Sequence, residues 1–426
     1  MKVKLITLSS VAAILLCSTA YADNHTSNQQ LQNEINTLNK KVSSIQSSNT
    51  YVTTGQVGGD FVANAGDQNR SYGILKLLQN TKNEPTLNIG LDTQLNTTWA
   101  LRTSSVTGIG PNDNFDGTKS ATKTYINDAK IVLLANANNY VHFQTRFGDI
   151  DPIVSMGDDD SKLLKLEDAT VFIGDLNKTP FYGSAGLEYV NFGVYNEAWF
   201  PTDSLSKQLF FTESLPGVLM GYTGHGINWT VTAFDRNSGE NIPNNPAFAS
   251  QIQYEYDSGD NNITFGAGVI TDERGTGSGI AGLIDSNGPD SNNSTLPAID
   301  FNTGFTYGNF DMNIEYNKLL KSVRISSNNS KTNISVISTQ ADYIIPTSKQ
   351  ITLSAGYSES FGLGYFDPQT NDPWNNSAKN MAQAGVDVQA TDNIDVGLEN
   401  TYAREYTAVN KVNSVNTITL LVHAIF

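Results

Sequence analysis

The sequence contains a single cysteine, Cys17, in 426 residues. Cys17 lies in an N-terminal stretch with the features of a secretory signal, so the rest of the exported chain has no disulfide. A protein outside the cytoplasm that lacks disulfides needs another source of stability. A closed β-sheet, in which every strand is paired, is one such source.

Long apolar runs and charged residues are also scarce. Beyond the N-terminal stretch no apolar run reaches the roughly 20 residues of a membrane-spanning helix, which excludes a helical membrane protein. Charged residues make up only 16% of the chain, which does not fit a disordered protein, and the net charge of −16 argues against nucleic acid as a partner. Gly, Asn, Thr, Ser, Tyr and Phe are frequent instead, a mixture typical of barrel strands.

The N-terminus predicts a signal peptide over residues 1–22. Lys2 and Lys4 precede a mostly apolar stretch, and Ala20-Tyr21-Ala22 supplies a small-x-small cleavage site. The apolar stretch is short for a membrane anchor. Lipidation of Cys17 is an open alternative to simple cleavage, although the large residue before it does not fit a lipidation site.

Two segments precede the regular part of the chain. Residues 23–50 carry apolar residues in steps of four and three, which predicts a short periplasmic coiled coil that associates protomers. A linker helix is the other interpretation, because two heptads are marginal alone. The apolar residues of 23–50 that form this pattern are Leu31, Ile35, Leu38, Val42 and Ile45.

Residues 51–85 leave three interpretations open: a plug-like segment, an extra strand or a linker.

From Thr86 onward, apolar and polar residues alternate. Leu87, Ile89 and Leu91 share one face of the first run, while Asn, Asp and Gln occupy the other. A period of two over fifteen residues gives a strand long enough to cross a bilayer at a tilt. About sixteen such runs fill residues 86–426. We therefore predict an all-β fold, a transmembrane antiparallel up-and-down β-barrel of about sixteen strands after the short N-terminal coiled-coil helix.

The links between the runs support this prediction. Short turns such as Gly224–Gly226 and Gly308-Asn309 alternate with long polar segments such as 236–247 and 272–297, as periplasmic turns alternate with outer loops. A soluble sandwich or propeller is the alternative, but it does not predict aromatic residues such as Trp99, Trp229 and Tyr402 at strand ends, which suit interfacial girdles.

The last run alternates up to the C-terminus. Its apolar face is Ile418, Leu420, Val422, Ala424 and Phe426. This pattern resembles the C-terminal signature that the outer-membrane barrel-assembly machinery recognises. We expect localisation in the outer membrane of a Gram-negative bacterium, with outer-membrane lipid and that machinery as partners.

The faces predicted to line the lumen are rich in carboxylates, which should favour cations. The alternative is that these groups are solvated or paired and do not affect ion selectivity. The predicted pore-lining residues are Asp92, Lys130, Arg146, Glu255, Asp300, Asp311, Glu315, Asp387, Asp395 and Glu399.

The third long link, residues 196–216, is unusually apolar for an exposed loop. It is expected to fold inward and narrow a pore; packing against a neighbouring protomer or against lipid A is the alternative. The constriction candidates are Trp199, Phe200, Phe210, Phe211 and Glu213.

Signals for an enzyme are weak. The histidines lack metal-ligand spacing, and Gly275–Gly279 resembles a phosphate loop only superficially because it lacks the lysine. The acidic segment 149–160 lacks the EF-hand spacing, so a hydrated loop is favoured over a divalent-cation site. We expect neither catalysis nor a cofactor.

One stretch resembles a known family. Gly186-Leu187-Glu188-Tyr189-Val190-Asn191-Phe192-Gly193, followed by Phe200-Pro201, Thr212-Glu213-Ser214 and Gly221-Tyr222, resembles the LbtU-type siderophore porin family. Asn191 stands where that family's Tyr-x-Pro-Phe-Gly segment has proline. The resemblance implies passage of iron or a siderophore, although an acidic lumen suits a cation better than an anionic ferric siderophore.

Three functions follow from these patterns. The first is a porin-like channel for an iron form or a siderophore, and the second is a general, weakly cation-selective diffusion porin. The third is a surface interaction barrel that transports nothing. The length of the chain argues against a TonB-dependent receptor, because it is too short for 22 strands and a folded plug. We expect a homo-oligomer such as a trimer.

Overall fold

A computed structural model describes residues 51–54, 73, 75, 86–102, 121–148, 165–195, 200, 202–236, 246–259, 261–281, 295–323, 331–347, 349–363, 378–391, 393–406 and 412–425. The predicted signal, the predicted coiled coil, Trp199 and Phe426 lie outside the described residues. Among those that are described, no helix is long and apolar enough to cross a membrane.

Sixteen strands follow one another along the chain, each paired antiparallel with the next. They are β2 (Thr86–Arg102), β3 (Ala121–Asn138), β4 (Val141–Gly148), β5 (Lys165–Ile173), β6 (Phe181–Tyr189), β7 (Ser214–Gly224), β8 (Ile227–Phe234), β9 (Ala247–Asp257), β10 (Asn261–Ile270), β11 (Ala298–Tyr307), β12 (Phe310–Leu319), β13 (Ser335–Ile345), β14 (Ile351–Phe361), β15 (Ala378–Thr391), β16 (Ile394–Tyr406) and β17 (Val412–Ile425).

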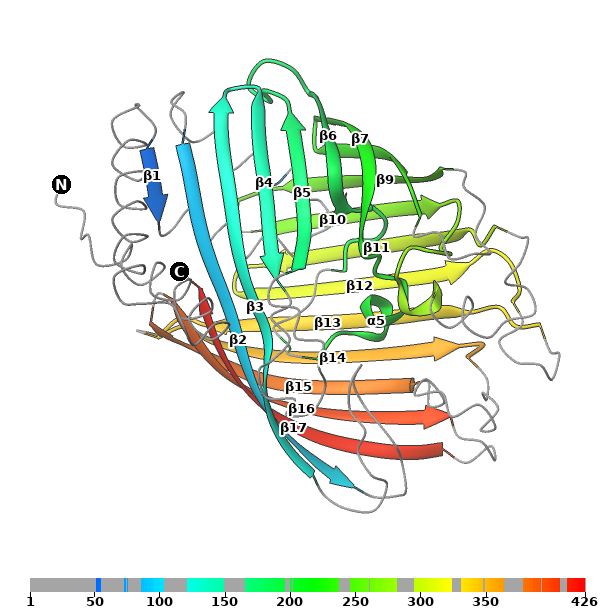
Figure 1. The fold of residues 1–426 in the computed structure, drawn as a ribbon. Helices are drawn as coiled ribbons and strands as arrows, with labels where there is room; N and C mark the ends of the chain where they lie inside the picture. The colour runs from blue at the N-terminus through cyan, green and yellow to red at the C-terminus, as the bar shows by residue number, and fades with distance from the viewer. Residues whose placement is uncertain are drawn as a thin grey trace, which may run out of the picture.

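The sheet closes on itself through β17 and β2 (Figure 1). Their antiparallel register runs from Val415 opposite Arg102 to Ile425 opposite Asp92. Closure gives each of the sixteen strands a neighbour on both sides, so their backbone groups can form hydrogen bonds within the sheet. The predicted closed antiparallel barrel of sixteen strands is confirmed.

A further short strand, β1 (Tyr51–Thr54), pairs parallel with the start of β2, where Tyr51 lies opposite Thr86. Because β17 reaches β2 only at Asp92, the first residues of β2 have one edge that β17 does not cover. β1 occupies this edge and extends the sheet there (Figure 1).

The alternation read from the sequence separates two faces of the barrel. Outward side chains are apolar and exposed, for example Met220 at 73% and Phe181 at 64%. Inward neighbours such as Ser184 and Thr232 are buried and polar. An apolar outer surface around a polar interior is the arrangement of a barrel that lies in lipid.

Short turns and long links alternate as predicted, so the barrel has a short-turn end and a long-loop end. The β7–β8 turn, His225-Gly226, has two residues with positive φ, which matches the right-handed twist of the flanking strands. At Gly226 a Cβ would lie 2.4 Å from the backbone oxygen of Glu255, so only glycine fits without a shift. The β5–β6 link is longer and is held by Asp175, whose backbone oxygen accepts from Lys178 and Thr179.

Two apolar clusters fill parts of the barrel interior. The larger one, here called the inner core, joins barrel residues such as Phe234 and Ile270 to loop residues such as Phe210 and Leu296 at the long-loop end. The smaller one lies on β3–β7 at the short-turn end. Much of the interior is therefore packed protein.

Candidate functional site

In the link between β6 and β7, the described residues 190–195, 200 and 202–213 fold into the barrel and are called the inward loop here. Its helix α5 (Leu205–Phe210) contacts β12, β13, β14 and β15, and Figure 1 shows it beside these strands. The hydroxyl of Ser204 caps the helix by accepting from the backbone nitrogen of Lys207. Leu205 and Phe210 are almost completely buried, so the apolar side chains of this loop serve as packing.

Hydroxyl groups fix α5 to the wall. The backbone nitrogen of Ser206 donates to Ser338 Oγ at 3.2 Å, and that hydroxyl donates in turn to Ser206 Oγ at 2.8 Å. The backbone nitrogen of Leu205 donates to Ser358 Oγ at 3.4 Å. These bonds satisfy amides at the start of a helix, which have no partner inside it.

Two of the predicted pore-lining carboxylates hold other parts of the same loop. Glu315 on β12 accepts from the backbone nitrogens of Val194 at 3.2 Å and Tyr195 at 3.0 Å. Glu399 on β16 accepts from the backbone nitrogen of Thr202 at 3.0 Å. Because β12 and β16 lie four strands apart, the loop crosses a large part of the interior and narrows it.

Aromatic residues of the loop lie against the wall. A Cβ at Gly356 would lie 3.1 Å from the Phe200 ring, and one at Gly385 would lie 3.2 Å from it, so two glycines make room for Phe200. Phe211 packs against Tyr189 with ring centroids 5.0 Å apart. Glu213 is exposed, so the described constriction candidates divide into packed aromatic groups and one exposed carboxylate.

Residues 271–281, called the cap segment, cover the inward loop. The backbone nitrogen of Glu213 donates to the backbone oxygen of Thr276 at 2.8 Å. Asp272 forms ion pairs with Arg236 and Arg274, and all three are buried. Burial raises the pKa of Glu273 to about 8. Burial also raises the pKa of Tyr195 in the inward loop well above its ordinary value.

The strand register places all ten predicted pore-lining side chains on the inward face. Residues that lie opposite one another on paired strands share a face, as Asp92 and Lys130 do, and likewise Val132 and Arg146. Following these pairs from strand to strand around the sheet assigns the face of each remaining residue. Their surroundings differ, however. The ones that are buried are Arg146, Asp300, Glu315, Asp387 and Glu399, and those that retain exposure are Asp92, Lys130, Glu255, Asp311 and Asp395.

Arg146 is the centre of a charged group on β4 and β5. Its guanidinium lies 2.6 Å from Glu167 and 3.0 Å from Asp168, and it donates to the hydroxyl of Tyr189 at 2.8 Å. Asp168 also accepts from Ser214 at 2.7 Å. A cation enclosed by two carboxylates adds little positive charge to the lumen.

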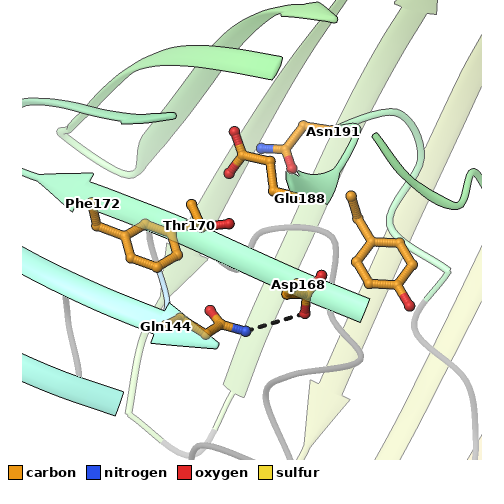
Figure 2. A pocket seen from close by; sticks show the side chains of 7 residues that line it. Gln144, Asp168, Thr170, Phe172, Glu188 and Asn191 are labelled. Atoms are coloured by element: carbon orange, nitrogen blue, oxygen red, sulfur yellow. Dashed lines mark hydrogen bonds between the residues drawn. The ribbon is translucent and has the colours of Figure 1, made fainter. Parts of the chain in front are cut away.

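A small cavity adjoins this group, and Figure 2 shows Gln144 directed at Asp168 across neighbouring strands. It is lined by Gln144, Asp168, Thr170, Phe172, Glu188, Tyr189 and Asn191. The space for the centre of a water molecule is about 10 Å3, room for roughly one water. The cavity is therefore too small to be the passage of a solute.

Sequence reasoning missed several residues of the site. Ser338, Ser358 and Gln383, which hold the inward loop, were not singled out, because single polar residues on a polar face carry no signal of their partner. The inward apolar residues Val132 and Leu134 were also missed. The unbroken apolar run 131–134 was a usable signal, since a strand with one polar face does not contain it.

No family model matches the chain. No curated protein matches it either. Solved structures, in contrast, match its fold. The outer membrane channel DcaP of Acinetobacter baumannii superposes with a TM-score of 0.53 and 15% identity over 80% of this chain and 97% of that channel. For OmpF of Salmonella typhi, solved with daunomycin, the TM-score is 0.52 with 12% identity over 81% and 98% of the two chains.

The chain has the outer-membrane porin fold. A third structure, the anion-selective porin from Comamonas acidovorans, agrees with a TM-score of 0.50 and 8% identity over 80% of this chain and 100% of that porin. At such identities the likeness concerns the fold alone. A closed barrel with this fold and an apolar outer face lies in the outer membrane of a Gram-negative bacterium.

Proposed function

We propose that the protein is a porin-like channel that lets small solutes cross the outer membrane. The observation that carries this proposal is the inward loop, whose described residues cross the barrel from β6 to Glu399 on β16 and narrow it. Polar inward residues that retain exposure, such as Asn262, Thr264 and Asn302, support passage of hydrated solutes.

The proposed channel favours cations. At the short-turn end of β9–β16, Glu255, Asp311 and Asp395 face inward and retain exposure. A watery passage lined by carboxylates attracts cations and repels anions. The basic residue Arg146 does not balance them, because Glu167 and Asp168 pair with it.

Conductance in a planar lipid bilayer tests the channel. Purified full-length protein in a potassium chloride gradient is expected to give discrete current steps and a reversal potential of the sign for potassium permeation. Heat-denatured protein from the same preparation is the control. A folded barrel that inserts and passes no current would support the alternative of a non-transporting surface barrel and would contradict this proposal.

A more specific proposal is passage of iron. It rests on the resemblance of residues 186–222 to LbtU-type siderophore porins, and the exposed carboxylates favour a cationic form such as ferrous iron over an anionic ferric siderophore. Deleting the gene should lower radio-iron uptake under iron limitation, and the intact gene should restore it. Separate measurements with ferrous iron and with a ferric siderophore identify the cargo, and unchanged uptake of both would end the iron role.

We also propose that protomers associate, as the heptad pattern of residues 23–50 indicates. The mass of the detergent-solubilised protein should correspond to a multiple of the chain. Removing residues 23–50 should reduce this mass if the coiled coil is the contact.

A further inference from the structure

The short-turn end of the lumen contains an apolar patch that a water-filled pore does not need. Val132 lies opposite Arg146 and Leu134 lies opposite Gln144, so both share the face of the polar lumen residues. By the same register, Phe172 and Leu219 both lie opposite Ser184. The sequence therefore places four apolar side chains inside the barrel.

These four side chains are each only 1% exposed, so something covers them. Outward residues of the same strands show the contrast, since Phe143 is 43% exposed and Val218 is 55% exposed. The four inward residues and Tyr182, which is 6% exposed, line what we call the socket.

Leu75, a residue that precedes the barrel in sequence, belongs to the same cluster. It is 1% exposed, as completely buried as the residues of the socket. Its Cδ1 lies 3.4 Å from the point where a Cβ at Gly174 would stand, which places Leu75 at the β5–β6 turn. A Cβ at Gly174 would lie 2.9 Å from the Cβ of Tyr182, so the glycine leaves room for Tyr182 beside Leu75.

The position of β1 agrees with this route. β1 pairs with residues 86–89 at the same end of the barrel, so residues 51–54, which precede Leu75 in the sequence, also lie there. Ile425, at the end of β17, and Leu176, in the β5–β6 link, pack against the cluster from its border. Three separate parts of the chain thus meet around the socket.

We propose that Leu75 is a peg that seats in the socket and closes the β3–β7 side of the periplasmic mouth. Solutes then leave along the acidic wall of β9–β16. The socket is a binding site for one apolar side chain of this protein's own N-terminal part, and its occupancy determines how wide the exit is.

Cysteine labelling tests whether the side chain at position 75 is buried in the socket. In a Cys17→Ala background, each variant has one cysteine, and Leu75→Cys is compared with Ser258→Cys, which lies exposed in the β9–β10 turn at the same end. With a charged methanethiosulfonate reagent, we expect labelling at position 75 to be about tenfold slower or more, because a buried side chain reacts only after local opening. Equal rates at the two positions would overturn the proposal.

Single-channel conductance tests whether Leu75 narrows the periplasmic exit. This experiment rests on the proposed channel function. Leu75→Asp cannot seat in an apolar socket, so its mean conductance should exceed that of the parent protein, while Leu75→Met should match the parent. The control is Leu320→Asp, at an exposed leucine beyond the end of β12.

The outcomes separate the two proposals. If the parent protein conducts and Leu75→Asp does not change the current, the peg does not narrow the exit and this inference is wrong. If the parent protein does not conduct, the channel proposal fails, and the labelling rates alone decide whether Leu75 occupies the socket.

Discussion

The carboxyl group of Glu273 is completely buried in the cap segment. Its Oε2 accepts from the hydroxyls of Ser278 at 3.1 Å and Thr276 at 3.3 Å. Burial is the main cause that raises its pKa from 4.5 to about 8, and neighbouring Asp272 adds to the rise. The folded protein therefore keeps this group protonated at neutral pH, whereas the unfolded chain ionises it.

The stability of the protein should fall as pH rises between about 4.5 and 8, because only the folded state still binds this proton. The contribution of Glu273 is fully present below pH 4.5 and is lost as pH passes its folded pKa. The slope it contributes is up to about 1.4 kcal/mol per pH unit. Glu273→Gln should flatten the dependence, measured as the urea midpoint of lipid-embedded protein at pH 5, 6, 7 and 8.

Glu213→Gln is the matched control, since Glu213 is exposed beside the same segment. Its pH dependence should follow that of the parent protein. Equal slopes for the parent and Glu273→Gln would show that the buried carboxyl does not hold its proton.

At the scale of elements, the inward loop depends on partners far away in the sequence. Glu315 accepts two backbone N–H groups of the loop, 121 and 120 residues before it. Each oxygen of the carboxyl group accepts one of these bonds, Oε1 from Val194 and Oε2 from Tyr195. Glu315 is therefore the point at which the first part of the loop is attached to β12.

Glu315→Gln should loosen this attachment, because the amide offers one acceptor and turns a donor toward the second N–H group. Leaving one buried N–H group without a partner costs about 1–3 kcal/mol. We expect the amides of Val194 and Tyr195 to exchange with deuterium about tenfold to a hundredfold faster. Hydrogen-exchange mass spectrometry of peptides covering residues 190–195 measures this.

Glu359→Gln provides the comparison, since Glu359 pairs with outward-facing Ile337 near the long-loop end of β14. It should leave the exchange of residues 190–195 unchanged. An equal increase in both variants would mean that general destabilisation, and not the lost acceptor, is the cause.

The strands could be predicted from the sequence, and the contacts inside the barrel could not. Alternation such as Leu87, Ile89 and Leu91 is local, so each run predicts its own strand and faces. The bond between Ser206 and Ser338 joins residues 132 positions apart and follows no period. Inward orientation of Glu315 followed from the pattern, but its use as an anchor depends on where the loop lies.

At the scale of the whole molecule, the packed regions determine where water and ions can pass. The inner core fills the long-loop end between α5 and strands from β7 onward, and the socket cluster fills the short-turn end at β3–β7. We therefore expect solutes at the short-turn end to pass next to β9–β16, where inward carboxylates retain exposure. The exposed carboxylates of this wall should therefore dominate ion selectivity.

A triple variant with Glu255→Gln, Asp311→Asn and Asp395→Asn should have a lower cation-to-anion permeability ratio than the parent protein. In water, one charge at about 7 Å from an ion contributes about 0.6 kcal/mol, so losing three should reduce the ratio by about twofold or more. The reversal potential in a potassium chloride gradient measures the ratio, and the effect should shrink in 1 M salt, where the Debye length is about 3 Å. The same measurement on Asp235→Asn, exposed beyond the end of β8, should match the parent. If the triple variant keeps the parent's ratio in dilute salt, ions do not pass along β9–β16, because these three carboxylates would otherwise lie beside their path.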